Sequence, residues 1–89
     1  MTINKAMVEY RLPNPTSQED LEGKWGTVLT FGDKVLLAGY YYNGRNKPSY
    51  FGAVYERMTI DEDVLGIREV SEVKFEDDGH AIAWAIGRC

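Results

Sequence analysis

The chain has 89 residues, of which 44% are hydrophobic and 27% are charged, and its net charge is −4. This length predicts one domain, residues 1–89, and the acidic charge argues against non-specific binding to nucleic acid. No apolar run approaches the roughly 20 residues of a membrane span, and the N-terminal residues lack the apolar core of a signal peptide. Because Cys89 is the one cysteine, no intramolecular disulfide can form, and a cytoplasmic location is expected.

Residues 3–12 predict a strand. Polar and apolar side chains alternate loosely there, which is typical of a strand with one buried face. Val8, Tyr10 and Leu12 are the side chains that we expect to point inward. Pro13 would end this strand, because proline has no N–H group to donate to a neighbouring strand.

A short helix is expected next in the chain. Thr16 or Ser17 can cap its start, because either hydroxyl can accept a hydrogen bond from a backbone N–H of the first turn. The helix would run through Leu21 and stop at Gly23. Leu21 and Trp25 would supply its apolar contacts with one face of a sheet.

Residues 27–55 predict three antiparallel strands joined by two tight turns. Gly32-Asp33 fits a type II′ turn, and Asn43-Gly44 fits a two-residue type I′ turn, in which both positions need positive φ. These turns would set the register of the sheet. The row of apolar side chains that this register aligns across the three strands consists of Leu29, Leu36 and Phe51. Both faces of the sheet are apolar at the centre, so both need a cover, for which a second copy of the chain is the expected source.

The last third of the chain predicts one helical turn and one hairpin. The capping-box pattern of residues 59–62 predicts a single turn that continues through Leu65. Asp78-Gly79 is typical of a type I′ turn, and residues 70–86 around it would form the hairpin. Four apolar side chains would share one face of this hairpin: Val73, Phe75, Ile82 and Trp84.

The expected fold is therefore mainly β. It is an antiparallel meander of five to six strands, curled or barrel-like, with one or two short helices. Gly39 and Gly52 lie inside predicted strands, where glycine often marks a bulge or a sharp bend. Such bends would support the curvature of a small barrel.

The tyrosine-rich segment around Asn43-Gly44 is the most unusual local composition in the chain. It combines aromatic rings with cations, and the two-residue turn would place Tyr42 opposite Arg45 and Tyr40 opposite Lys47. Such pairs suit base stacking or a protein interface, although tyrosine is also an ordinary strand residue. The candidate binding residues are Tyr40, Tyr42, Arg45, Lys47 and Tyr50.

Acidic residues form two clusters in the last third, where residues 59–89 hold three basic and eight acidic side chains. We interpret the clusters as a candidate acidic interaction face or as solvated turns, and neither cluster matches a calcium-binding loop. The cluster residues are Asp61, Glu62, Asp63, Glu76, Asp77 and Asp78. His80 is expected beside a turn and Cys89 in a terminal tail, so neither predicts a metal site or a nucleophile.

The sequence favours a small non-enzymatic interaction protein. Its small size, mild acidity and lack of a recognisable catalytic motif resemble the small inhibitors encoded by phages and mobile elements, and this resemblance implies a bacterial protein as the partner. The alternative is a protein that binds or sequesters a nucleotide-like ligand at the tyrosine-rich hairpin. A hydrolase that uses acidic residues or His80 is the least favoured interpretation. No cofactor is expected. The chain is expected to form a dimer or a higher homo-oligomer.

Overall fold

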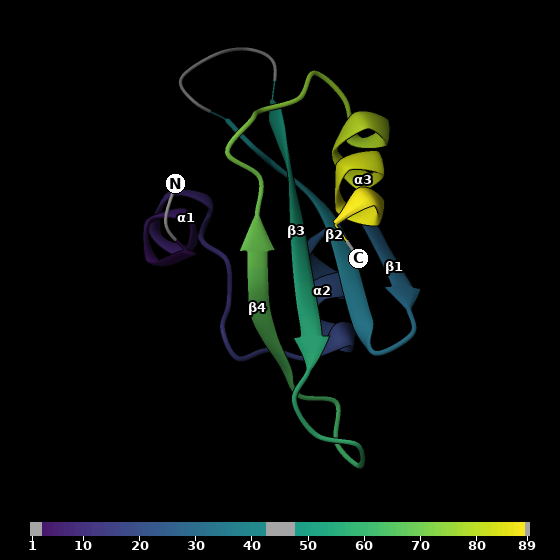
Figure 1. Ribbon diagram of the computed structural model, residues 1–89. Helices are drawn as coiled ribbons and strands as arrows, with labels where there is room; N and C mark the ends of the chain where they lie inside the picture. The colour runs from purple at the N-terminus through teal and green to yellow at the C-terminus, as the bar shows by residue number, and fades with distance from the viewer. Residues whose placement is uncertain (1–2, 43–47, 89) are drawn as a thin grey trace.

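The computed structural model describes residues 3–42 and 48–88, and within them the chain forms a four-stranded antiparallel sheet and three helices (Figure 1). In chain order the elements are α1 (Ile3–Tyr10), α2 (Gln18–Lys24), β1 (Thr27–Phe31), β2 (Lys34–Tyr41), β3 (Ser49–Arg57), β4 (Leu65–Val70) and α3 (Asp78–Gly87). The strands lie side by side in the order β1-β2-β3-β4. α3 crosses one face of the sheet over β2 and β3, and α1 and α2 pack against the opposite face.

The fold is mainly β, as expected. However, the sheet is open and has four strands among the described residues, whereas a barrel-like sheet of five to six strands was predicted. β1 and β4 form its two edges. A register shift between Val54 and Tyr55 is the irregularity in the β3–β4 pairing. The two glycines expected to bend the sheet instead make room for large side chains, because a Cβ on Gly39 would lie 2.3 Å from the Phe51 ring and one on Gly52 would lie 2.5 Å from the Trp84 ring.

The turn between β1 and β2 confirms the prediction from Gly32-Asp33. Gly32 has a φ of 67°, which a type II′ turn requires at its first position. The pairing that follows is the expected one, with Phe31 opposite Lys34 and Leu29 opposite Leu36. Turn chemistry is local, so this part of the register can be predicted from the sequence.

The register between β2 and β3 differs from the prediction by three residues. Leu36 lies opposite Val54, and Phe51 lies opposite Gly39. The predicted turn at Asn43-Gly44 lies outside the described residues, but the register that it would set is wrong, because Tyr41 lies opposite Ser49. An odd shift moves side chains to the other face of a strand. Phe51 consequently packs under α1, away from the row that contains Leu36.

Residues 3–10 form helix α1 instead of the predicted strand. Ala6 and Tyr10 are buried four residues apart on one side of the helix, and Val8, expected to point inward, is 81% exposed. The helix ends in a Schellman arrangement. Arg11 has a φ of 57°, and the N–H of Leu12 donates to the carbonyl oxygen of Met7 at 3.1 Å.

Helix α2 confirms the short helix expected after Thr16. The Ser17 side chain caps it by accepting a hydrogen bond from the N–H of Asp20 at 3.1 Å. Leu21 and Trp25 are both buried in the core, as predicted. The helix continues through Lys24, one residue past Gly23.

Residues 78–87 form helix α3, so the predicted C-terminal hairpin is wrong. The Asp77 side chain accepts the N–H of His80 and caps the helix where a turn was expected. Ala81 and Ala85 face the sheet and are fully buried. Alanine is the strongest helix former, and its spacing of four residues outweighs the alternation of larger apolar side chains. Phe75 forms an isolated bridge with Tyr50.

The helical turn predicted at residues 59–65 is also absent from the described structure. Thr59 Oγ1 donates to the carbonyl oxygen of Glu62 and closes a non-helical turn. Leu65 begins β4, where it exchanges two backbone hydrogen bonds with Thr16. No helix in the described part of the chain is long and apolar enough to cross a membrane.

Candidate ligand-binding cleft

A cleft of about 430 Å³ opens where the ends of α1, α2 and β2 meet. Aromatic and charged side chains share its walls. The residues that line it are Glu9, Tyr10, Arg11, Lys24, Trp25, Tyr40, Tyr41 and Tyr42. We call this site the aromatic cleft.

Stacked rings form the inner wall of the aromatic cleft. Tyr10 lies parallel to Phe51, with 4.0 Å between the ring centroids and 8° between the planes. Trp25 meets the Phe51 ring edge-on at 5.6 Å and the Tyr40 ring edge-on at 5.5 Å. Phe51 is fully buried between these rings and Gly39. The wall is therefore held by core packing and is already formed without a ligand.

The outer part of the aromatic cleft exposes two rings to solvent. Tyr42 is 63% exposed and Tyr40 is 41% exposed, and their ring centroids lie 6.5 Å apart. Large exposed aromatic side chains are unfavourable in water and are common where a protein binds a planar or apolar group. These two rings offer a surface on which a flat ligand can stack.

Three of the residues that line the cleft carry a buried polar atom without a hydrogen-bond partner in the described structure, namely Trp25 Nε1 and the hydroxyls of Tyr10 and Tyr41. Of the three, the indole N–H is the group that most clearly needs an acceptor from a ligand, because the two tyrosine hydroxyls lie close enough to interact with each other. Burial, and after it the neighbouring Tyr41, raises the pKa of Tyr10 to about 12. Its hydroxyl thus keeps its proton at neutral pH and remains a donor.

Cations surround the rings of the aromatic cleft. Lys24 Nζ lies 5.1 Å from the centre of the Trp25 ring and donates to the carbonyl oxygen of Arg11 at 2.9 Å. Lys74 Nζ lies 5.3 Å from the centre of the Tyr41 ring and 3.4 Å from a carboxylate oxygen of Glu9. With the side chain of Arg11, which also lines the cleft, three cations and one carboxylate give the region a net charge of +2 in a chain whose total is −4. The cleft therefore attracts anions locally.

Residues 12–89 match the family model described as nucleotide modification associated domain 4 (Nmad4). The chain belongs to the Nmad4 family. No curated protein and no solved structure matches it. The matched residues include Lys24, Trp25 and three of the four tyrosines that line the cleft, whereas Tyr10 and Arg11 precede the matched range.

The structure places two of the predicted binding residues in the aromatic cleft, Tyr40 and Tyr42. Tyr50 lies opposite Tyr40 in the sheet, with 6.5 Å between the ring centroids, so Tyr40 is not paired with Lys47 as predicted. Arg45 and Lys47 lie outside the described residues, as does the predicted pair of Tyr42 with Arg45.

Sequence reasoning misses the half of the cleft that comes from α1 and α2. The alternation of residues 3–12 places Tyr10 in a strand, and the pattern around Leu21 indicates only a core contact for Trp25. Lys24 next to Trp25 is a cation–aromatic pair visible in the sequence. This pair is the available signal, but nothing local indicates that it meets Tyr40.

The loops that carry the two acidic clusters lie at opposite ends of the sheet, so the clusters do not form one continuous face (Figure 1). Asp63, in the loop after β3, accepts hydrogen bonds from the backbone N–H groups of Gln18 and Glu19 and pairs with Arg57 at 3.4 Å. The bond from Gln18 is the main cause of the lowered pKa of Asp63. Asp61 and Glu62 are exposed in the same loop.

The second cluster belongs to the start of α3. The Asp77 carboxylate accepts the N–H of His80 at 2.7 Å, which is the main cause of its lowered pKa, and also contacts His80 Nδ1 at 2.8 Å. Asp78 accepts a hydrogen bond from Thr27 Oγ1 at 3.1 Å, and Glu76 is exposed. Among the described residues, no group of three acidic or histidine side chains could hold a metal ion. Cys89 lies outside the described part of the chain.

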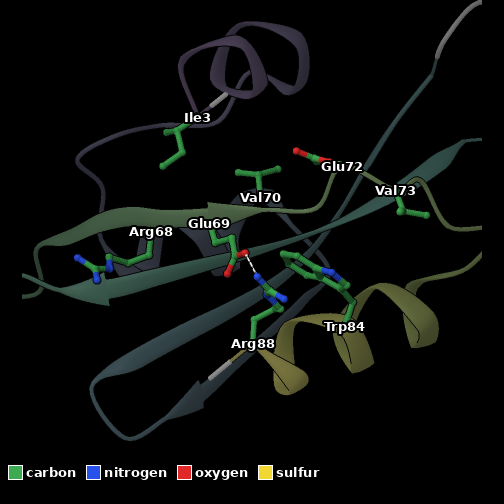
Figure 2. Close-up of a pocket in the computed structure, with 8 residues that line it drawn as sticks. All are labelled: Ile3, Arg68, Glu69, Val70, Glu72, Val73, Trp84 and Arg88. Atoms are coloured by element: carbon green, nitrogen blue, oxygen red, sulfur yellow. Dashed lines mark hydrogen bonds and ion pairs between the residues drawn. The ribbon is translucent and has the colours of Figure 1, made fainter. Parts of the chain in front are cut away.

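A second hollow, of about 480 Å³, lies between α3 and the β4 edge (Figure 2). Trp84, Val70 and Val73 supply its apolar surface. Arg88 lies 5.8 Å from the Trp84 ring and donates from Nε to Glu69 at 3.0 Å. The two arginines that line this hollow, Arg68 and Arg88, are balanced by two carboxylates, Glu69 and Glu72. Because its lining has no net positive charge, this hollow suits an anion less well than the aromatic cleft does.

Proposed function

We propose that this Nmad4 domain binds a nucleotide, free or within a single strand, in the aromatic cleft. The observation that carries the proposal is the combination of exposed rings, a buried indole N–H without an acceptor, and nearby cations. The name of the family, which associates it with nucleotide modification, supports the same class of ligand.

Each part of a nucleotide has a matching group in this proposal. The base stacks on Tyr40 or Tyr42, and stacking of this kind tolerates any base because every base has a flat π-face. A base oxygen or nitrogen accepts the hydrogen bond that Trp25 Nε1 lacks. The phosphate lies beside Lys24 and Arg11 at the edge of the cleft.

The first prediction tests stacking. Replacing Tyr42 with alanine removes an exposed ring, so the fold should persist while nucleotide affinity falls roughly tenfold, because one base–aromatic contact contributes about 1–3 kcal/mol. Isothermal titration calorimetry with nucleoside 5′-monophosphates measures this. Phe31→Ala is the matched control, since Phe31 is also an exposed aromatic residue but lies at the far end of β1.

The same titration separates the parts of the ligand. Nucleoside monophosphates should bind more tightly than the corresponding nucleosides, and inorganic phosphate should bind most weakly of the three. Short single-stranded oligonucleotides distinguish a free nucleotide from one within a strand. If neither mononucleotides nor oligonucleotides bind the wild-type protein, the proposal is wrong.

The second prediction concerns the strained position of Arg11. L-residues are disfavoured in the left-handed conformation that its φ of 57° defines, and glycine is the usual residue at this helix end. Arg11→Gly should therefore leave the free energy of unfolding unchanged or raise it by up to about 1 kcal/mol. Its affinity for a nucleoside monophosphate should fall roughly tenfold, and its affinity for the nucleoside should not change.

Thermal unfolding and calorimetry on the same samples test this second prediction. Arg68→Gly is not a suitable control, because Arg68 lies inside β4. Lys5→Ala is a better one, since it removes a cation from α1 outside the residues that line the cleft. A loss of monophosphate binding in Lys5→Ala equal to that in Arg11→Gly would show that only general charge matters.

A non-enzymatic interaction protein is the second candidate function, and it is the one that the sequence alone favours. Exposed tyrosines are typical of the residues that contribute most to protein interfaces, and Tyr40 and Tyr42 are such residues in this domain. In this function the cleft receives an acidic or aromatic segment of a partner protein. Competition decides between the two candidates, because a nucleotide that binds the cleft must displace such a partner.

A further inference from the structure

The outer edge of β1 presents unpaired backbone groups to solvent. The turn at Gly32-Asp33 closes with Phe31 opposite Lys34, and the two form a hydrogen-bonded pair. Such pairs alternate along antiparallel strands, so Thr27, Leu29 and Phe31 use their N–H and C=O groups toward β2. The backbone groups of Val28 and Thr30 consequently point away from the sheet.

One face of this same edge is apolar and exposed. Leu29 is 44% exposed and Phe31 is 59% exposed, and both lie on the face of the sheet that carries α3. α3 packs over β2 and β3 and does not extend across β1. Trp84 lies on the flank of α3 toward β4, so Ile82 and Ile86, on the opposite flank by helical geometry, lie toward β1.

We propose that β1 pairs with β1 of a second copy of the chain, antiparallel, about a two-fold axis at Leu29. Val28 of each copy then lies opposite Thr30 of the other, and their backbone groups form four hydrogen bonds. Leu29 packs against its own counterpart on the exposed apolar face. The product is one continuous eight-stranded sheet in which the edge of β1 no longer meets water.

The chemistry of β1 favours a second copy over another kind of partner. Exposed edge strands are usually protected by a lysine, a proline or a bulge. Residues Thr27–Phe31 contain no lysine and no proline, and their regular pairing with β2 shows no bulge. The strand has no charged side chain, so two copies meet without repulsion. The face that it leaves exposed is self-complementary about Leu29.

This edge-to-edge contact differs from the one predicted from the sequence, in which a second copy covers an apolar face of the sheet. Helices of the same chain cover both faces over β2 and β3, so a second copy is not needed there. The aromatic cleft lies beyond the start of β1, away from the two-fold axis at Leu29. The inference therefore stands whether or not the cleft binds a nucleotide.

Leu29→Lys tests the proposal by placing two ammonium groups side by side at the axis. Sedimentation velocity should give twice the chain mass for the wild type at high micromolar concentration and the mass of one chain for Leu29→Lys. Ile60→Lys is the matched control, because it adds the same charge to a highly exposed side chain in the β3–β4 loop. It should keep the wild-type mass.

Hydrogen exchange locates the contact. The N–H groups of Val28 and Thr30 should exchange slowly in the wild type and at least tenfold faster in Leu29→Lys, and the N–H of Leu29, which is bonded to β2, should change little. A wild-type protein that stays monomeric at high micromolar concentration overturns the proposal. A dimer in which Leu29→Lys keeps the wild-type mass and exchange also overturns it.

Discussion

Replacing Gly52 with alanine should destabilise the protein strongly, although it adds only one methyl group. The new Cβ would lie 2.5 Å from the Trp84 ring and 2.7 Å from the carbonyl oxygen of Ala81. The second contact is with the backbone of α3, so a side-chain rotation cannot relieve it. α3 must move away from the sheet, at a cost of about 3 kcal/mol.

The position of Gly52 adds to this cost. Its N–H donates to Ser71 Oγ at 3.0 Å, and its carbonyl oxygen accepts the N–H of Ser71 at 2.8 Å. Ser71 is fully buried, so any shift of β3 that accompanies the movement of α3 leaves buried polar groups without partners. In a domain of this size we expect the melting temperature to fall by roughly 10 °C or more.

Gly23→Ala is the matched control for Gly52→Ala. Gly23 lies within α2, and no atom lies within 4 Å of the Cβ that alanine would add. The same substitution should therefore raise stability by about 0.5–1 kcal/mol, because alanine favours helix over the unfolded chain. Chemical denaturation measures both values. Equal and small effects at the two glycines would contradict the close packing of α3 on β3.

The parts of the fold that could be predicted from sequence are those set by local chemistry. Gly32 at a type II′ position fixes the β1–β2 register, and the Ser17 hydroxyl fixes the start of α2. In each case the deciding group and the structure that it determines lie within a few residues of one another.

The sequence predictions are wrong where two periodicities fit the same short segment. In residues 3–10, Val8 and Tyr10 suggest a strand, but Ala6 and Tyr10, four residues apart, are the buried pair. The C-terminal segment has the same ambiguity, and its three alanines at positions 81, 83 and 85 are the available signal for a helix. Tertiary packing decides such cases.

The β2–β3 register could not be predicted because it depends on contacts distant in sequence. Phe51 lies opposite Gly39, where its ring occupies the space that a side chain would fill, and Tyr10 from α1 covers it. For the same reason the sequence indicates only one part of the aromatic cleft, Tyr40 and Tyr42. Trp25 and Tyr10 reach it through the packing of the helices on the sheet.

Replacing Phe51 with alanine should lower the free energy of unfolding by about 3–5 kcal/mol, a large share of the total for a domain of this size. Phe51 is fully buried, stacks on Tyr10 at 4.0 Å and meets Trp25 edge-on at 5.6 Å. Its loss opens a cavity beneath the inner wall of the aromatic cleft. Urea denaturation followed by circular dichroism measures the change.

A milder variant connects this packing to the proposed function. Phe51→Leu keeps an apolar side chain and should cost about 1–2 kcal/mol, so the protein stays folded. Because Tyr10 and Trp25 then lose the ring that orients them, nucleotide affinity should fall several-fold. Leu36→Val is the matched control, since Leu36 is equally buried in the sheet but belongs to the core under α3.

The comparison of these two variants separates stability from the shape of the cleft. Leu36→Val should lose a similar amount of stability, about 1 kcal/mol, and should bind the nucleotide as the wild type does. If Phe51→Leu also keeps wild-type affinity, the stacked rings do not shape the binding site, and the ligand must rest on Tyr40 and Tyr42 alone. If both variants lose affinity equally, the loss reflects stability and not the packing beneath the cleft.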